Sequence, residues 1–242
     1  MIEAILFDLD DTLLRNDMDK FLPAYFGLLG KHASRFLDRE RFLQELLFGT
    51  QAMIASEDTA VSNRDVFWNT FQSRTGLDPD ELEPFFDLFY RETFPQLRGT
   101  TEKRPDALPL VQLCLERGLK IVIATNPLFP ARAIYERLDW AGVPVAAFDY
   151  DLVTTYENMH ATKPHPAYYN EILAAIDCPP QAALMIGDDW KNDIIPASGL
   201  GIRTYWIAQN GAEPPESALA AGYGTLADLL NRLQNGWLET LA

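Results

Sequence analysis

The sequence predicts an α/β fold, a doubly wound parallel sheet that is interrupted by an inserted all-α domain. From about residue 100 onward, short apolar segments of strand type alternate with helical segments. This alternation is typical of a parallel sheet with right-handed crossovers and helices on both faces. A further apolar strand at residues 2–7 is separated from that part by a purely helical segment, residues 17–95. The first strand therefore belongs to the same sheet, and the helical segment is an insertion.

The first strand leads directly into a cluster of acids. Asp8 and Asp10 stand two residues apart, and Asp11 and Thr12 follow. Side chains alternate faces along a strand, which predicts that Asp8 and Asp10 project to one side at the edge of the sheet where ligands bind. Like charges about 4 Å apart repel by roughly 4 kcal/mol at an effective dielectric near 20, which favours a cation or a shared proton. The alternative is an acidic turn in which Asp and Thr cap a helix.

The insertion has the periodicity of helices and is unusually aromatic. It contains eleven of the 14 phenylalanines, many at helical spacing, which predicts that most of them pack in a core of its own. One helix start is explicit, because Asp78 provides an N-cap, Pro79 lies in the first turn and Glu81 follows three residues after the cap. The predicted helices span residues 17–35, 39–56, 63–75 and 79–94.

The remaining elements alternate in type along the chain. The predicted helices span residues 105–117, 130–141, 166–176, 192–198 and 226–233. The predicted strands span residues 119–124, 148–153, 182–186 and 202–207, and the second of these is short. The segment 209–224 is rich in Ala, Gly and Pro and is predicted to be a surface loop.

Composition limits the classes of partner. With 242 residues, 48% of them hydrophobic and 23% charged, the chain is long enough for a core domain and a smaller one. The formal net charge is -15, with 35 acidic and 20 basic residues. This balance argues against nucleic acid and against an anionic membrane surface as partners. A small anionic substrate is still compatible, because one lysine and a few backbone amides can bind it locally.

Two sequence features indicate the compartment. The two cysteines, Cys114 and Cys178, show no metal-ligand spacing. The chain also shows no basic and apolar leader pattern and no apolar run long enough to span a bilayer. We therefore expect a cytoplasmic protein, and either a monomer or a homodimer.

Polar residues follow three further predicted strands, at the point where each strand ends. They are Thr125 and Asn126, then Lys163 at the end of an irregular loop, and then Asp188 and Asp193. Because the carboxyl ends of parallel strands meet at one edge of the sheet, we expect these side chains to lie beside Asp8 and Asp10. Acids, a hydroxyl and a lysine at one edge suit a phosphate held beside Mg²⁺, which prefers carboxylate oxygens.

The set of motifs resembles that of the haloacid dehalogenase superfamily. The family's first motif, Asp-x-Asp-x-Thr after a strand, is matched by Asp8, Asp10 and Thr12. The second, a Thr or Ser at a strand end, is matched by Thr125, and the third, a lysine, by Lys163. The fourth, Gly-Asp followed by another Asp, is matched by residues 187, 188 and 193. The resemblance implies a Rossmann-like core formed by residues 1–16 and 96–242, and a helical cap formed by residues 17–95.

The resemblance also implies a role for each residue. Asp8 would be the nucleophile and Asp10 the general acid and base. Thr125, Asn126 and Lys163 would bind the phosphoryl oxygens. The implied ligands of Mg²⁺ are Asp8, Asp10 through its backbone carbonyl, Asp188 and, directly or as an orienting group, Asp193.

The second acid of the first motif bears on the reaction. Family members that cleave carbon–halogen bonds or phosphonates lack an acid at the position of Asp10. The resemblance therefore implies Mg-dependent hydrolysis of a small phosphate monoester, a phosphorylated metabolite that the cap encloses, through an aspartyl-phosphate intermediate. The alternatives are a phosphomutase of the same superfamily and a non-catalytic binding or scaffold member.

Two positions depart from the family pattern. Asp11 stands where the family often has Gly, which adds a negative charge to the first motif. Ala161 and Thr162 precede Lys163 without the Gly that is common there, which leaves the path of the lysine loop open.

Overall fold

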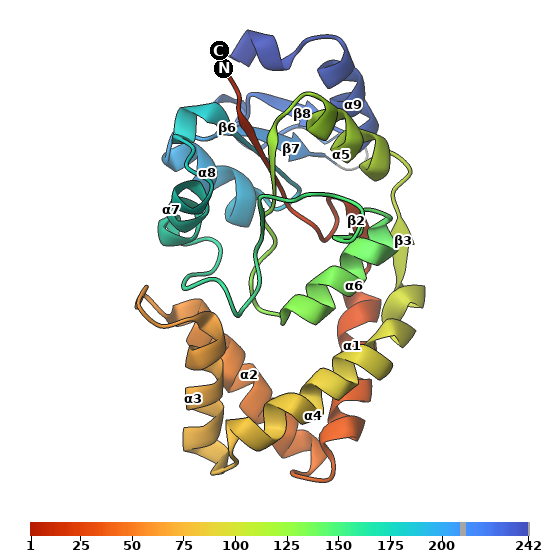
Figure 1. Cartoon of the computed structure of the whole chain (residues 1–242), viewed down its shortest axis with the longest axis vertical. Helices are drawn as coiled ribbons and strands as arrows, with labels where there is room; N and C mark the ends of the chain where they lie inside the picture. Colours follow the sequence, from red (N-terminus) through yellow and green to blue (C-terminus); the bar gives the residue numbers. More distant parts are fainter. Residues whose placement is uncertain (209–211, 242) are drawn as a thin grey trace.

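The computed structural model describes residues 1–208 and 212–241. A parallel sheet flanked by helices forms one part, and four long helices form the other (Figure 1). The sheet has six strands in the order β5-β4-β1-β6-β7-β8, and every neighbouring pair is parallel. Its strands are β1 (Ala4–Phe7), β4 (Lys120–Ile123), β5 (Leu152–Val153), β6 (Ala183–Gly187), β7 (Arg203–Ile207) and β8 (Gly222–Gly224). The predicted doubly wound α/β fold is confirmed.

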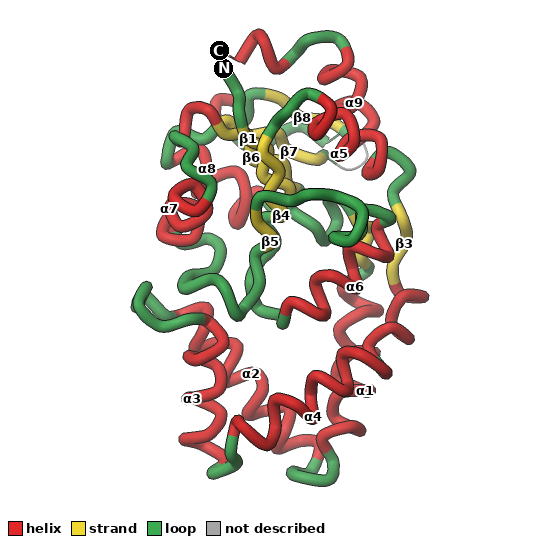
Figure 2. The backbone as a smooth tube through the Cα atoms, in the orientation of Figure 1, coloured by secondary structure: helices red, strands yellow, loops and turns green. Residues whose placement is uncertain are grey.

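The two faces of the sheet are covered by different helices. The helices are α5 (Ala107–Glu116), α6 (Ala131–Ala141), α7 (Pro166–Ala175), α8 (Ile195–Gly199) and α9 (Leu226–Gln234). Along β1, Ile5 and Phe7 are buried with side chains of α5 and α9, whereas Ala4 and Leu6 are buried with α7 and α8. The strands are enclosed between these helices (Figure 2). Both faces of β1 are apolar, because a central parallel strand is buried on both sides.

The predicted segment 192–198 forms two short elements. A π-helical turn, η3 (Trp190–Ile194), precedes α8. Further 3₁₀ turns are η2 (Pro180–Ala182), η4 (Ser217–Leu219) and η5 (Leu238–Leu241). In residues 1–208 and 212–241, no helix combines the length and the apolar character that a membrane span requires.

The surface-loop prediction for residues 209–224 is wrong at its end. Residues 222–224 form the edge strand β8, with Gly222 paired to Tyr205. A side chain at Gly222 would press on the rings of Tyr205 and Trp237. A strand of three residues with glycine at both ends has no apolar alternation, so the sequence pattern could not indicate it. Residues 209–211 lie outside the described residues.

The four helices predicted in the insertion are confirmed. They are α1 (Met18–Ala33), α2 (Arg39–Ala55), α3 (Asn63–Thr75) and α4 (Pro79–Glu92). Each is preceded by an N-cap residue whose side chain accepts a hydrogen bond from a backbone N–H of the first turn. These residues are Asp17, Asp38, Ser62 and Asp78. Such caps satisfy backbone donors that have no partner within the helix.

The aromatic core of these helices is continuous with that of the sheet, which corrects the expectation of a separate core. Phe21, Phe71 and Phe89 belong to the same buried cluster as Ile5. At the junction, Phe94 stacks on Trp140 of α6 with ring centroids 5.4 Å apart. Large rings on both sides of the junction bury more area together than separately.

The chain crosses between the helical part and the sheet part twice, and the two crossings pair. The strands β2 (Leu14–Asn16) and β3 (Thr101–Lys103) form an antiparallel ribbon, and a 3₁₀ turn, η1 (Phe94–Thr100), precedes β3. The sequence did not predict this ribbon, because each strand has three residues and mixed polarity. The domain boundaries at 16/17 and 95/96 stay a prediction.

Candidate active site

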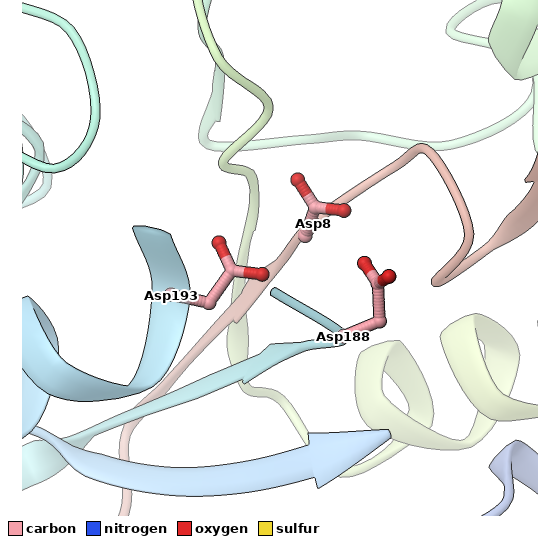
Figure 3. Close-up of side chains that lie close together, drawn as sticks. All are labelled: Asp8, Asp188 and Asp193. Carbon is pink, nitrogen blue, oxygen red and sulfur yellow. The ribbon is translucent and has the colours of Figure 1, made fainter. Parts of the chain in front are cut away.

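Three carboxylates converge at the carboxyl end of the sheet. Asp8 follows β1, Asp188 follows β6, and Asp193 lies on the η3 turn. Figure 3 shows the three side chains pointing toward a common space. One carboxylate oxygen of each residue lies within 4.8 Å of the others. We call these three residues the acidic cluster.

Lys163 joins two members of the acidic cluster. Its Nζ donates to Asp8 Oδ1 at 2.8 Å and to Asp193 Oδ1 at 2.6 Å. The Lys163 side chain is only 2% exposed, and that of Asp193 only 1%. In such a site the ammonium and the carboxylates stabilise one another, because each would be costly to bury alone.

The cluster carries more negative charge than Lys163 can balance. Burial raises the pKa of Asp8 well above its usual value, and Asp193 and Asp188 add to this rise, whereas Lys163 opposes it. Burial and then the charge of Asp193 raise the pKa of Asp188 to about 7. Burial also raises the pKa of Asp193, against the effect of Lys163. Three carboxylates beside one ammonium leave two negative charges when all are ionised.

This donor set fits Mg²⁺. Carboxylate oxygens are hard ligands, and Mg²⁺ is bound by a few of them together with water and substrate oxygens. Its charge of two would balance the excess of the acidic cluster. Thr12 Oγ1 also donates to Asp188 Oδ1 at 3.4 Å, which ties the first motif to the fourth.

Glycine at position 187 makes room for the acidic cluster. A Cβ placed on Gly187 would overlap the carboxylate of Asp193. Asp189, two residues later, is exposed and caps the η3 turn, accepting from Lys191 N at 2.9 Å and Asn192 N at 3.1 Å. The Asp189 N–H donates to Asp193 Oδ2 at 3.1 Å. The cap of this turn is therefore Asp189, and the carboxylates of Asp188 and Asp193 lie in the acidic cluster.

The carboxylate of Asp10 lies outside the acidic cluster. Its Oδ2 accepts from Arg137 Nη1 at 2.5 Å and its Oδ1 from Asn16 Nδ2 at 2.9 Å. Strand alternation predicts that the Asp8 and Asp10 side chains project together, but β1 ends at Phe7 and a turn follows, so this expectation is wrong for Asp10. A cation between the two carboxylates is therefore not supported by their partners, and only the backbone carbonyl of Asp10 remains as its predicted metal ligand.

Arg137 was missed in the sequence analysis. It lies on α6, where its neighbours on the buried face are Ala133, Ile134, Leu138 and Ala141. An arginine at a position of the apolar helix face is the signal that could have indicated a buried partner. The identity of that partner, Asp10, could not be inferred because the two residues are 127 positions apart.

Asp11 adopts a backbone conformation that explains why glycine is common at its position. Its φ is 54°, in the left-handed region, which Asp tolerates better than most residues. Its carbonyl accepts from Arg104 Nη2 at 2.5 Å and its Oδ1 from Asn16 N at 3.2 Å. Burial raises the pKa of Asp11. Asp11 therefore shapes the turn that presents Asp10.

The predicted phosphate-binding residues lie in the loop after β4 and in the lysine loop before α7. Thr125 is buried, and its carbonyl accepts from Thr154 Oγ1 at 2.7 Å and Tyr168 OH at 2.9 Å. Asn126 Oδ1 accepts from the Lys163 backbone N–H at 3.2 Å. The loop after β4 and the lysine loop are thus held together, and the Lys163–Pro164 peptide between the loop and α7 is cis.

Two curated relatives cover most of the chain. A phosphoserine phosphatase of Thermus thermophilus is 26% identical over 254 residues, with 94% of this chain and 98% of that protein covered. The pyrophosphatase PpaX of Bacillus mycoides is 26% identical over 209 residues, covering 86% of this chain and 84% of the relative.

Solved structures share the fold. A HAD phosphatase from Thermococcus onnurineus matches with a TM-score of 0.61 and 22% identity, covering 97% of this chain and 98% of that one. A 2-haloacid dehalogenase from Pseudomonas syringae matches with a TM-score of 0.59 and 22% identity, covering 97% and 99%. Residues 2–201 also match the family described as haloacid dehalogenase-like hydrolase. The chain therefore belongs to the haloacid dehalogenase-like hydrolases and is an enzyme of that family.

Proposed function

We propose that this enzyme is a Mg²⁺-dependent phosphatase that hydrolyses small phosphate monoesters through an aspartyl-phosphate on Asp8. The observation that carries the proposal is the buried position of Asp8, beside Lys163 and within the acidic cluster. The names of the phosphoserine phosphatase and pyrophosphatase relatives support phosphoryl chemistry.

In the first step, a carboxylate oxygen of Asp8 attacks phosphorus and the bond between phosphorus and the ester oxygen breaks. Asp10, in the protonated form that it reaches by taking up a proton from solvent before the first turnover, donates this proton to the departing alkoxide, which leaves as the alcohol. Splitting the reaction at a covalent intermediate replaces one difficult displacement with two easier ones. For this step, one Asp10 oxygen must exchange its contact with Arg137 or Asn16 for a contact with the leaving group.

In the second step, water attacks the phosphorus of the aspartyl-phosphate. Asp10, now ionised, accepts a proton from this water, and the bond between phosphorus and the Asp8 oxygen breaks. Inorganic phosphate is released and both aspartates return to their starting states. The same residue serves as acid and then as base, as the reversal of proton flow between the two steps requires.

The remaining polar residues bind the phosphoryl group. Thr125, Asn126 and Lys163 offer a hydroxyl, an amide and an ammonium to its oxygens, and positioning and charge stabilisation supply most of the catalysis in phosphoryl transfer. Asp8, Asp188, Asp193 and the Asp10 carbonyl are the residues proposed to hold Mg²⁺, which when bound neutralises phosphoryl charge. We propose that the substrate is a small phosphorylated metabolite. We also propose that the protein is cytoplasmic and that it is a monomer or a homodimer.

The test compares matched substitutions in the assay of inorganic phosphate release from p-nitrophenyl phosphate. Asp8→Asn is expected to lower kcat by about 10³-fold or more, because it removes the nucleophile. Asp189→Asn makes the same chemical change at the exposed cap of η3, where Asn also caps well, and is expected to have little effect. Removal of divalent cations should abolish activity, and added Mg²⁺ should restore it.

The result that would overturn the proposal is an equal rate for the wild type and Asp8→Asn. Transfer of phosphate within the substrate, without release of inorganic phosphate, would instead identify a phosphomutase. An absence of both Mg²⁺ binding in calorimetry and turnover would identify a non-catalytic member of the family.

A further inference from the structure

A large apolar cavity lies between the four helices of the insertion and the loops at the carboxyl end of the sheet. Its volume is about 700 Å³, within the range that holds small organic molecules. All four helices contribute to its wall, mostly with aromatic and aliphatic side chains, for example Phe26, Phe42, Trp68 and Phe86. In Figure 2 these helices face the end of α6 and the loops that follow β4 and β5.

One end of the cavity wall is connected to the candidate active site through the chain and through side-chain contacts. Residues 128–130 belong to its wall and are separated from Thr125 and Asn126 by Pro127 alone. The Phe129 ring in that wall lies beneath the Arg137 guanidinium, 4.7 Å from Arg137 Cζ to the ring centroid. The same guanidinium binds Asp10. Two successive contacts therefore lead from the proposed general acid to the wall of the cavity.

Polar groups accompany this end of the wall. The Tyr25 ring packs on that of Phe129, with centroids 5.4 Å apart. The Tyr25 and Tyr90 hydroxyls are hydrogen bonded at 2.8 Å. Arg137 Nη2 is buried and has no hydrogen-bond partner among residues 1–208 and 212–241. A buried guanidinium N–H without a partner is costly, but Arg137 itself is not among the residues that line the cavity.

The charges in the wall are all negative and all engaged. Glu83 binds Arg64, Asp87 accepts from Arg132 Nε at 2.6 Å, and Glu157 accepts from the Ala131 N–H at 3.0 Å. No Lys, Arg or His side chain of the described residues lines the cavity. An anionic leaving group would lose its hydration there without meeting a cation, whereas an apolar group would gain by burial.

We propose that this cavity binds the leaving group, so that the preferred substrates are phosphate monoesters of bulky, uncharged, apolar alcohols. This inference rests on the proposed phosphatase function and specifies its substrate class. The phosphate lies at the acidic cluster and the alcohol oxygen faces Asp10. The hydrocarbon portion extends past Phe129 into the helical insertion. Esters whose leaving groups carry a carboxylate, such as phosphoglycolate and phosphoserine, the latter with an ammonium as well, are poor substrates.

The first experiment compares primary alkyl esters, whose leaving groups differ in size and charge more than in intrinsic reactivity. The wild type is expected to show a kcat/KM for 3-phenylpropyl phosphate at least about tenfold above those for phosphoserine and phosphoglycolate, since a few buried methylenes give discrimination of this size. Methyl phosphate is expected to be hydrolysed slowly, because its methyl group is too short to reach from the acidic cluster into the cavity. A kcat/KM for phosphoserine or phosphoglycolate that equals or exceeds that for 3-phenylpropyl phosphate would overturn the inference.

Two substitutions in the wall connect this preference to the cavity. Leu46→Trp fills part of the space and should lower kcat/KM for 3-phenylpropyl phosphate by about tenfold, with that for methyl phosphate little changed. Gln51→Trp, on the same helix but exposed, is the matched control and should leave both unchanged. Thr50→Arg places a cation in the wall and should reduce the ratio of kcat/KM for 3-phenylpropyl phosphate to kcat/KM for phosphoserine. If Leu46→Trp does not change kcat/KM for 3-phenylpropyl phosphate relative to methyl phosphate, and Thr50→Arg does not change it relative to phosphoserine, the cavity does not bind the leaving group.

A binding measurement separates this inference from the phosphatase proposal. Calorimetry with 3-phenylpropanol, the alcohol without phosphate, should show binding to the wild type and to Asp8→Asn, and weaker binding to Leu46→Trp. Binding with no hydrolysis of any phosphate ester would contradict the phosphatase function while locating an apolar ligand site. Hydrolysis with no binding of the alcohol and no preference for apolar esters would contradict the cavity inference alone.

Discussion

An ion pair between the buried Arg137 and the half-buried Asp10 joins the helix α6 to the first motif. Arg137 Nη1 lies 2.5 Å from Asp10 Oδ2, and the Arg137 side chain is 2% exposed. Asn16 binds the other oxygen of Asp10. Both oxygens of the proposed general acid are therefore held, and its orientation is set by residues that lie outside the family's four motifs.

We expect Arg137→Met to destabilise the protein by about 2 kcal/mol, because the Asp10 carboxylate, whose side chain is 27% exposed, loses its charged partner. Arg132→Met is the control on the same helix. Its partner Asp87 and Arg132 itself are each 46% exposed, and loss of such a surface pair should cost less than about 1 kcal/mol. Urea unfolding measures both, and equal losses would show that the Arg137 pair has no special role.

Asp10→Asn should separate the two chemical steps. p-Nitrophenolate is a good leaving group that needs little protonation, so the first step with p-nitrophenyl phosphate should persist. The second step lacks its base, and steady-state turnover should fall by about 10²- to 10⁴-fold. Rapid mixing should then show a burst of one nitrophenolate for each enzyme molecule, with phosphate bound covalently to the protein. If the rate of nitrophenolate release in the first turnover falls as much as steady-state turnover does, so that no burst is seen, Asp10 is not the base of the second step alone.

Gly187→Ala should weaken the acidic cluster without a change in the fold. The added methyl group would overlap the Asp193 carboxylate and displace it from Lys163. We expect at least about a tenfold loss of Mg²⁺ affinity, since a misplaced ligand or orienting group has this effect. Gly199→Ala is the control, because a Cβ there meets nothing within 4 Å. Calorimetric titration with Mg²⁺ compares the two, and unchanged affinity in Gly187→Ala would contradict the prediction.

The raised pKa of Asp188 predicts how pH affects the metal-free protein. Its folded-state pKa of about 7 lies well above the usual value for an aspartate, so the folded state binds this proton more tightly than the unfolded state. The stabilisation from Asp188 is complete below pH 4 and is lost as the pH rises toward 7, by up to about 4 kcal/mol. Asp188→Asn should therefore be more stable than the wild type at pH 8 without metal.

The control for this prediction is the same comparison at pH 4, where both side chains are neutral and the two proteins should differ little. Saturating Mg²⁺ should reverse the order at pH 8, because it stabilises the wild type and binds the variant poorly. Thermal unfolding in the presence and absence of a chelator measures each case. If the wild type is more stable than Asp188→Asn at pH 8 without metal, the raised pKa of Asp188 is contradicted.

Local pattern was enough for most of the fold. The four insertion helices were predicted within two residues at either end, because their apolar periodicity and their caps are encoded within each helix. The strands β2, β3 and β8 were not predicted. Each has three residues, and each is stabilised by a partner elsewhere in the chain, at positions that no local window contains.

The candidate site divides in the same way. Asp8, Thr125, Lys163 and Asp188 each follow a predicted strand, and parallel strands bring their carboxyl ends to one edge, so their proximity could be inferred from the order of elements. The partners of Asp10 could not. Arg137 and Asn16 contact Asp10 only after α6 and the β2–β3 ribbon have packed. The positions of these residues in the sequence do not indicate the contact.

The sequence by itself therefore determined the doubly wound sheet, the helical insertion and the acids and lysine at the sheet edge, because these depend on periodicity and on the order of strands. Only the tertiary structure decided which carboxylates share Lys163, where the Asp10 side chain is bound, and that an apolar cavity adjoins the site. These features depend on contacts between residues far apart in the chain, whose energies arise only when the separate elements pack together.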